Sequence, residues 1–279
     1  MEVPYDYSGK SVFVAGGTSG INLGVAHAFA RAGARLAVLS RSQEKVDAAV
    51  AALKTHGGEA TGFAADVREP AAVEAALRQA GAQFGGIDVL ISGAAGNFPA
   101  PALGISPNGF KSVVDIDLLG TFHVLRAAFA HLNKPGAAVV NISAPQAYIP
   151  MELQMHVCAA KAGVDMITRV AAMEWGAAGV RVNSVSPGPI DNTEGMRRLA
   201  PTESLRKLVT DSVPLGHFGS TGDIAQACLW LASPYAAYVT GVVLPVDGGW
   251  SLGGFAASGA GLKKLLSAPP QPKSDGVIE

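Results

Sequence analysis

Short apolar runs alternate with alanine-rich stretches along most of the 279-residue chain, and this alternation constrains the fold more than any other feature. The runs are rich in β-branched residues and predict strands at residues 12–15, 35–40, 60–65, 89–92, 138–143, 180–186 and 242–246. The stretches between them predict helices at about 20–33, 43–56, 70–84, 107–132, 156–175 and 221–233. Strands that are apolar throughout and separated by helices indicate a parallel sheet covered on both faces. We therefore expect an α/β fold with a doubly wound parallel sheet, whose ligands bind beyond the carboxyl ends of the strands.

We expect one domain over residues 1–254, followed by a C-terminal tail. Residues 188–214 form a long irregular stretch, and a connection of this length favours a substrate loop or lid. From Gly253 the sequence is rich in glycine, alanine and serine, and it continues into APPQPKSDG. This composition predicts a mobile tail over residues 255–279.

Charge and composition exclude several classes of partner. A formal net charge of -1 gives no field for a polyanion, so we expect no nucleic-acid partner. No run approaches the ~18 uninterrupted apolar residues of a membrane span, and MEVPYDYSGK lacks the layout of a signal peptide. Two cysteines, Cys158 and Cys228, cannot form a disulfide framework, and the chain ends in GVIE rather than the peroxisomal Ser-Lys-Leu signal. We expect a cytoplasmic protein with no membrane partner and no metal.

The first predicted strand leads into GGTSGINLG, residues 16–24, which resembles a phosphate-binding turn. Backbone N–H groups at a helix start favour a pyrophosphate, and glycines allow a close approach. The turn departs from G-x-G-x-x-G because Asn22 stands where another glycine is expected; asparagine tolerates unusual φ angles and adds a side-chain donor. The pattern predicts a Rossmann-like nucleotide site at Gly16, Thr18, Ser19, Gly20, Ile21 and Asn22. The alternative is a tight strand-to-helix turn without a ligand.

The end of the second predicted strand bears on the choice of nucleotide. Sites that prefer NAD usually offer a carboxylate there, whereas this chain offers Arg41. A guanidinium suits a 2′-phosphate through charge-assisted hydrogen bonds, so we expect NADPH as the cofactor. The alternative is a solvated surface arginine. Asp66 and Val67, at the end of the third predicted strand, are expected beside the adenine ring.

Together these features resemble the short-chain dehydrogenase/reductase family, from about Tyr7 to Leu252. The glycine turn is similar to that family's T-G-x-x-x-G-x-G. Further matches are SGAAGN at 92–97, NIS at 141–143, RVNSVSPG at 181–188 and VTGVVLPVDGG at 239–249. The resemblance implies additional cofactor contacts at Ala94, Pro187, Gly188, Ile190 and Thr193.

The chain departs from the family at its catalytic signature, Tyr-x-x-x-Lys on one helix. That spacing lies one turn apart, so the ammonium can lower the pKa of the phenol. Here Lys161 is present and the tyrosine position is Val157. The serine position is Ala144, beside Ser143, and the structural asparagine is replaced by Asp117. Without the tyrosine as general acid, ordinary ketone or alcohol chemistry is not expected.

One branch of the family, the 2,4-dienoyl-CoA reductases, lacks Tyr-x-x-x-Lys, and this chain looks like that branch, especially its peroxisomal type. The matching segments are GAAGNFPAPA at 93–102, DIDLLGTF at 115–122, LQMHVCAAKAGVDMITRVAAMEWG at 153–176 and PGPIDNTEGMRRL at 187–199. The resemblance implies NADPH-dependent reduction of a 2,4-dienoyl-CoA to an enoyl-CoA, in which no alkoxide needs a proton from tyrosine.

The same resemblance implies roles for single residues. Lys161 would bind the nicotinamide ribose and supply positive potential, Asp117 would order a water or acid relay with it, and Ser143 is a third catalytic candidate. The alternatives are a surface lysine and a buried structural carboxylate. Expected substrate contacts are Asn97, Phe98, His156 and Arg197, the last toward the CoA phosphates. A core phenylalanine, a structural histidine and a solvated loop arginine are the corresponding alternatives.

Two other functions are compatible with the sequence. One is NADPH-dependent reduction of another activated carbonyl compound, and the other is a non-catalytic NADP(H)-binding protein that senses redox state. In the enzyme interpretation the partner is an acyl-CoA substrate. The resemblance also implies a homotetramer, formed through the predicted helices at 107–132 and 156–175.

Overall fold

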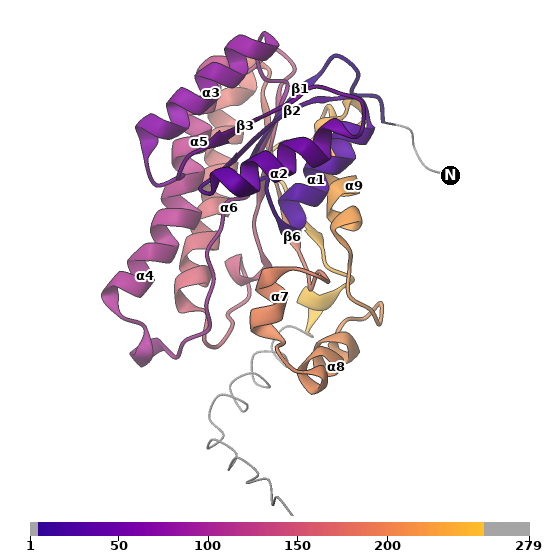
Figure 1. Ribbon diagram of the computed structural model, residues 1–279. Helices are drawn as coiled ribbons and strands as arrows, with labels where there is room; N and C mark the ends of the chain where they lie inside the picture. Colours follow the sequence, from indigo (N-terminus) through magenta and orange to yellow (C-terminus); the bar gives the residue numbers. More distant parts are fainter. Residues whose placement is uncertain (1–4, 254–279) are drawn as a thin grey trace, which may run out of the picture.

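The computed structural model describes residues 5–253, and its centre is a parallel sheet of seven strands (Figure 1). The strands are β1 (Ser11–Ala15), β2 (Arg35–Ser40), β3 (Ala60–Ala64), β4 (Val89–Ser92), β5 (Ala138–Ile142), β6 (Arg181–Pro187) and β7 (Val243–Val246). They lie in the order β3-β2-β1-β4-β5-β6-β7, and every neighbouring pair is parallel. Strands β1 to β3 are added toward one edge of the sheet, and β4 to β7 are added toward the other. The strand order therefore reverses between β1 and β4, and a doubly wound sheet binds its ligand at this point. The predicted fold class is confirmed, whereas the predicted tail lies outside the described residues.

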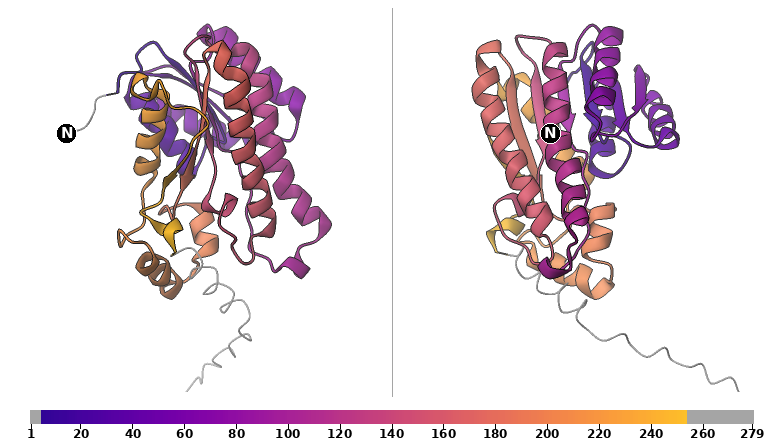
Figure 2. Two further views of the ribbon diagram at one scale, coloured as in Figure 1. Left: turned by 180° about the vertical axis from the view of Figure 1, so that it is seen from behind. Right: turned by 90° about the vertical axis from the view of Figure 1, so that its left-hand side faces the viewer.

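Helices cover both faces of the sheet (Figure 2). They are α1 (Gly20–Arg31), α2 (Gln43–Lys54), α3 (Pro70–Phe84), α4 (Pro107–Val113), α5 (Gly120–Ala128), α6 (Met155–Trp175), α7 (Glu194–Leu199), α8 (Glu203–Ser212) and α9 (Thr221–Ala232). Side chains of α1, α2 and α9 form one hydrophobic layer, and those of α3, α5 and α6 form the other. In β1, Val12 and Val14 enter the first layer, whereas Phe13 and Ala15 enter the second. Because both faces of β1 are buried, its residues 12–15 are all apolar.

The stretch predicted as one helix over 107–132 is helical throughout but changes its winding. Between α4 and α5 lies a π-helical segment, η2 (Val114–Leu119), and a 3₁₀ turn, η3 (Phe129–His131), follows α5. A π-helical turn is wider than an α-helical one and often occurs at functional sites. Asp117 lies within this segment and is buried.

The expectation that residues 188–214 are irregular is wrong, because this stretch contains α7 and α8. Each helix begins at a threonine cap: Thr193 accepts from Met196 N, and Thr202 accepts from Leu205 N. Such caps satisfy backbone donors that the first helical turn leaves free. Met196, Ala200, Leu205 and Val209 form a small buried cluster of their own, so the stretch is an ordered helical unit.

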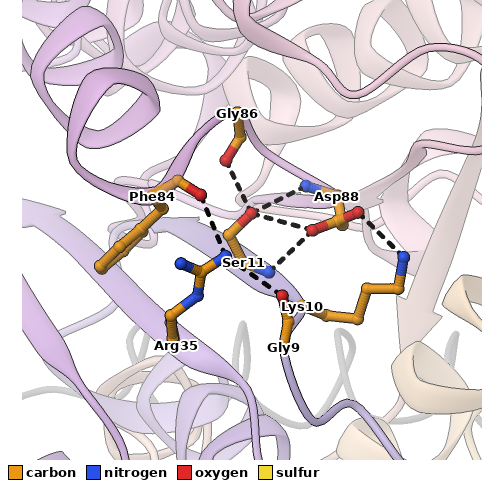
Figure 3. A network of polar contacts seen from close by, with 7 residues as sticks. All are labelled: Gly9, Lys10, Ser11, Arg35, Phe84, Gly86 and Asp88. Carbon is orange, nitrogen blue, oxygen red and sulfur yellow. Dashed lines mark hydrogen bonds and ion pairs between the residues drawn. The ribbon is translucent and has the colours of Figure 1, made fainter.

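At the amino end of the sheet a polar network joins β1, β2 and β4 (Figure 3). The Ser11 N–H donates to Asp88 Oδ2 at 2.9 Å, and Lys10 Nζ lies 3.1 Å from Asp88 Oδ1. Arg35 donates to the carbonyl oxygens of Gly9 and Phe84. Burial opposes ionisation of Asp88, but hydrogen bonds led by that from Ser11 prevail and lower its pKa. This network lies at the opposite end of the strands from the predicted ligand site.

In the described part of the chain, five further 3₁₀ turns lie between or after these elements: η1 (Ala102–Gly104), η4 (Pro145–Ala147), η5 (Gly176–Ala178), η6 (Pro234–Ala236) and η7 (Trp250–Leu252). Within residues 5–253, no helix is long and apolar enough to cross a membrane. Over the same residues, no three His, Cys, Asp or Glu side chains are grouped so that they could hold a metal ion.

Candidate cofactor and active site

A cleft of about 470 Å³ lies beyond the carboxyl ends of the central strands. Every residue predicted to bind the cofactor lines it: Gly16, Thr18, Ser19, Gly20, Ile21, Asn22, Arg41, Asp66, Val67, Ala94, Lys161, Pro187, Gly188, Ile190 and Thr193. Ser143 and Arg197 line it as well. The fold therefore brings together segments from seven parts of the sequence, from the glycine turn to α7.

The glycine turn between β1 and α1 fits a pyrophosphate. Gly16 and Gly20 have φ angles of +78° and +53°, a region that other residues rarely adopt. A Cβ atom at Gly20 would meet only Thr193 Cγ2, at 3.9 Å, so the turn is open toward the cleft. Ser19 makes no side-chain cap at the start of α1, whereas serines cap α2 and α9. The first N–H groups of α1 are therefore available to an anionic ligand.

Asn22 lies within α1 and has no unusual backbone angle; among the described non-glycine residues only Leu153 and Asn192 have positive φ. The tolerance of asparagine for unusual φ therefore does not explain its presence. Its side chain acts as a donor instead, because Asn22 Nδ2 lies 2.7 Å from the carbonyl oxygen of Gly93.

Two cationic side chains lie on the cleft beyond β2. Arg41 follows the strand directly, and Lys45 lies in the first turn of α2. Sequence reasoning missed Lys45, although a lysine four residues after Arg41 at a helix start faces the same end of the strand. After the neighbouring strand β3, Arg68 hydrogen bonds to Asp66, at 2.6 Å for its Nη2 atom, and this contact lowers the pKa of the Asp66 carboxyl.

A buried ion pair lies at the deep side of the cleft. Lys161 Nζ is 3.4 Å from Asp117 Oδ2, and it donates to the carbonyl oxygen of Ile142 at 3.0 Å. The Gly96 N–H donates to Asp117 Oδ1 at 2.6 Å, whereas Asp117 Oδ2 makes no hydrogen bond of good geometry. Burial raises the pKa of Asp117, and the Lys161 ammonium and the Gly96 N–H offset this only in part. The carboxyl can therefore hold a proton more readily than an exposed aspartate.

Apolar residues occupy the positions of the family's tyrosine and serine. Val157 is buried in a cluster with Val113 and Ala160. Ala144 lines the cleft. Ser143 also lines it, but its hydroxyl faces the buried Asp165 carboxyl without a hydrogen bond of good geometry.

Tyr148, the nearest tyrosine before Lys161 in the sequence, is half-exposed. Its hydroxyl lies 3.2 Å from Ser186 Oγ, so the phenol already has a polar partner on β6.

Four predicted site residues do not line the cleft: Asp117, Asn97, Phe98 and His156. The Phe98 ring packs edge to face against His156, with 4.4 Å between centroids, and burial lowers the pKa of His156. Arg197 lines the cleft and forms an exposed ion pair with Glu194 at 2.7 Å. Lining residues that sequence reasoning missed include Gln146, Leu199 and Trp250.

A doubly wound sheet, a glycine turn at its switch point and a buried lysine on the helix after β5 define the class of Rossmann-fold oxidoreductases. A family model described as "Enoyl-(Acyl carrier protein) reductase" matches residues 15–251. The chain belongs to the short-chain dehydrogenase/reductase family, whose members bind a nicotinamide cofactor.

Several named relatives are 2,4-dienoyl-CoA reductases. The chain is 46% identical to the peroxisomal 2,4-dienoyl-CoA reductase of Rattus norvegicus, over 86% of this chain and 83% of that protein. It is 41% identical to the corresponding peroxisomal reductase of Saccharomyces cerevisiae, over 88% of this chain and 86% of that one. Among solved structures, the citronellol catabolism dehydrogenase of Pseudomonas aeruginosa is 35% identical with a TM-score of 0.78, covering 90% of this chain and 98% of that one.

Proposed function

We propose that this protein uses NADPH to reduce 2,4-dienoyl-CoA thioesters to enoyl-CoA. The observation that carries the proposal is a site that keeps the buried Lys161–Asp117 pair while valine and alanine occupy the tyrosine and serine positions. Relatives named 2,4-dienoyl-CoA reductase support the same substrate class.

The chemistry of a dienoyl thioester suits a site of this kind. Its carbonyl withdraws electrons through two conjugated double bonds, so a hydride adds to the distal carbon and negative charge collects on the thioester oxygen. Bound NADPH would supply that hydride. A proton then adds to carbon, and the two additions complete the reduction. Because no alkoxide needs an immediate proton, Val157 in place of a tyrosine is no obstacle.

Two residues of this chain would stabilise the negative charge on the thioester oxygen and supply the proton that adds to carbon. Lys161 lines the cleft, so its ammonium lowers the energy of negative charge on the thioester oxygen. Asp117, whose pKa is raised by burial, can hold the proton and pass it toward carbon through Lys161 or a water molecule.

The preference for NADPH over NADH is supported by Arg41 and Lys45. Both side chains line the cleft at the end of β2, where the adenosine ribose lies in doubly wound folds. A 2′-phosphate there would meet two cations and no unpaired carboxylate, since Asp66 is already bonded to Arg68.

The test is NADPH oxidation by the purified protein with 2,4-hexadienoyl-CoA, acetoacetyl-CoA or no acyl-CoA, with NADH as a control for the cofactor. We expect turnover of the dienoyl ester alone, and losses of about 10²-fold or more in Lys161→Ala and Asp117→Ala. Asp115→Ala is the matched control, because Asp115 lies on the same π-helical segment but forms an exposed ion pair with Lys111. Turnover of acetoacetyl-CoA instead would contradict the proposal and direct attention to Tyr148. Binding of NADPH without turnover of either ester would favour a redox-sensing protein.

A homotetramer is part of the proposal and is supported by apolar side chains exposed along the second helical layer. These residues are Leu119, Phe122, Met166, Val170 and Met173. We expect Phe122→Glu to lower the molecular mass measured by light scattering, because an ionised side chain is costly inside an interface. Leu103→Glu is the control, since Leu103 is exposed outside that face. A cytoplasmic location is proposed as well, and cell fractionation tests it.

A further inference from the structure

Asn22 joins two segments that lie 71 positions apart in the sequence and both line the cleft. Its Nδ2 atom donates to the Gly93 carbonyl oxygen at 2.7 Å, and the residue is only 8% exposed. Water therefore competes poorly for this hydrogen bond. A glycine at position 22, which the family pattern leads one to expect, would offer no such donor.

The space around the Asn22 amide is shaped by two glycines. A Cβ atom at Gly93 would lie 2.3 Å from Asn22 Oδ1, and one at Gly16 would lie 3.1 Å from Asn22 Nδ2. The first distance is far below van der Waals contact, so any side chain at position 93 displaces the amide. The asparagine and Gly93 therefore fit together as a pair.

The loop that starts at Gly93 is held largely from outside. Its first four residues, GAAG, carry no polar side chain that could tie the loop to its surroundings. Instead Asn22 binds the Gly93 carbonyl, and the Gly96 N–H donates to Asp117 Oδ1 at 2.6 Å. At the far end, Arg198 Nη1 donates to the Asn97 carbonyl at 2.6 Å. The position of the Gly96 N–H therefore depends on where Gly93 is anchored, only three residues earlier.

We propose that Asn22 is a positioning residue: by holding the Gly93 carbonyl, it places the Gly96 N–H where it meets the Asp117 carboxyl group. The glycine turn is thereby coupled to the buried Lys161–Asp117 pair. The other titratable groups that act on Asp117 are Lys161 and His156, both on α6. The inference rests on the proposed function only in taking Asp117 as part of the reacting site.

Hydrogen exchange measured by mass spectrometry on the full-length protein tests this coupling without substrate or cofactor. We expect Asn22→Gly to speed exchange about ten-fold in a peptide covering Gly93–Phe98, because loss of one buried hydrogen bond loosens the contact at Gly96. Ala30→Gly is the matched control: it weakens α1 by the usual cost of a helical glycine but does not reach the loop. It should speed exchange in α1 and leave the 93–98 peptide unchanged. Fluorescence titration should show NADPH affinity about three- to ten-fold weaker in Asn22→Gly than in the control variant.

The close fit between Asn22 and Gly93 allows a second experiment. Gly93→Ala should loosen the same peptide, or prevent folding, because its methyl group displaces the Asn22 amide. The double variant Asn22→Gly/Gly93→Ala should fold and exchange no faster than Asn22→Gly alone. Unchanged exchange at residues 93–98 in Asn22→Gly would overturn the proposal, and so would additive effects in the double variant. Since no acyl-CoA enters these measurements, a failure of the dienoyl-CoA assay would leave their outcome intact.

Discussion

Replacing Lys161 by methionine removes a buried ammonium group while keeping most of the side chain's length. The Asp117 carboxyl, 1% exposed, would then keep the Gly96 N–H as its hydrogen-bond partner and lose the cation 3.4 Å away. Breaking a buried ion pair on one side costs about 3–5 kcal/mol, because the remaining charge has been taken out of water. Since Asp117 can escape part of this cost by taking up a proton, we expect a loss of about 3 kcal/mol at pH 7. At about 2–4 °C per kcal/mol, the melting temperature should fall by roughly 6–12 °C.

Urea unfolding of the two single variants and the double variant isolates the pair. Asp117→Asn keeps an acceptor for Gly96, so Lys161→Met/Asp117→Asn should be more stable than Lys161→Met alone, with a coupling energy of about 2 kcal/mol or more. The exposed pair Lys111 and Asp115 is the control and should show a coupling of at most about 0.5 kcal/mol. Additive losses at positions 117 and 161 would refute the argument that burial makes this pair interdependent.

The pH dependence gives an independent check on the same variant. Burial raises the pKa of Asp117 above its unfolded value of 3.8, and removal of Lys161 raises it further. Stability linked to such a group is fully present below the unfolded pKa and is lost as the pH rises through the folded pKa. Lys161→Met should therefore be closest to the wild type in acid and furthest from it at pH 8. A difference in stability between Lys161→Met and the wild type that stays constant from acid to pH 8 would contradict the raised pKa of Asp117.

Three other predictions concern separate parts of the molecule. Arg41→Ala should raise the KM for NADPH by roughly ten-fold or more and leave the KM for NADH unchanged, because it removes only a charge-assisted contact to a 2′-phosphate. An equal rise in KM for both nucleotides would argue against this role. Asp88→Asn should destabilise the protein by about 1–2 kcal/mol at pH 7. Because the pKa of Asp88 is lowered in the folded protein, its contribution to stability is present above pH 3.8 and is lost as the pH falls through the lowered pKa. The urea midpoint of the wild type should therefore fall in this acid range, and the midpoint of Asp88→Asn should not show that fall. Burial, with His56 and Arg31 nearby, lowers the pKa of His27, so wild-type stability should fall as the pH drops below about 6.5, and His27→Gln should flatten that slope in urea titrations.

The sequence was most informative where function depends on local backbone. The apolar runs placed all seven strands within about two residues, because strands that are buried on both faces are mostly apolar. The glycine turn and Arg41 follow β1 and β2 directly, so predicting the strands was enough to place these residues on one cleft.

Features that depend on tertiary packing were harder to predict. The π-helical segment around Asp117 has no distinct periodicity, so residues 107–132 looked like one regular helix. The helices α7 and α8 are six and ten residues long, and their threonine caps are weak signals in the sequence. Nothing local indicates that Phe98 and His156 pack together, since that contact joins a loop to the start of α6. Trp250 reaches the cleft from after β7, at the far edge of the sheet.

The packing of Val157 limits what evolution or engineering can do with this scaffold. Its side chain is 3% exposed and forms a cluster with Val113 and Ala160, against which Phe98 and Leu118 pack. A ring at this position would need space that these neighbours now fill, so Val157→Tyr would incur an overpacking cost of about 1–3 kcal/mol before any phenol reached Lys161. Introducing a tyrosine at this one position would therefore not by itself create a site for ketone reduction. Several apolar neighbours would have to be reshaped first.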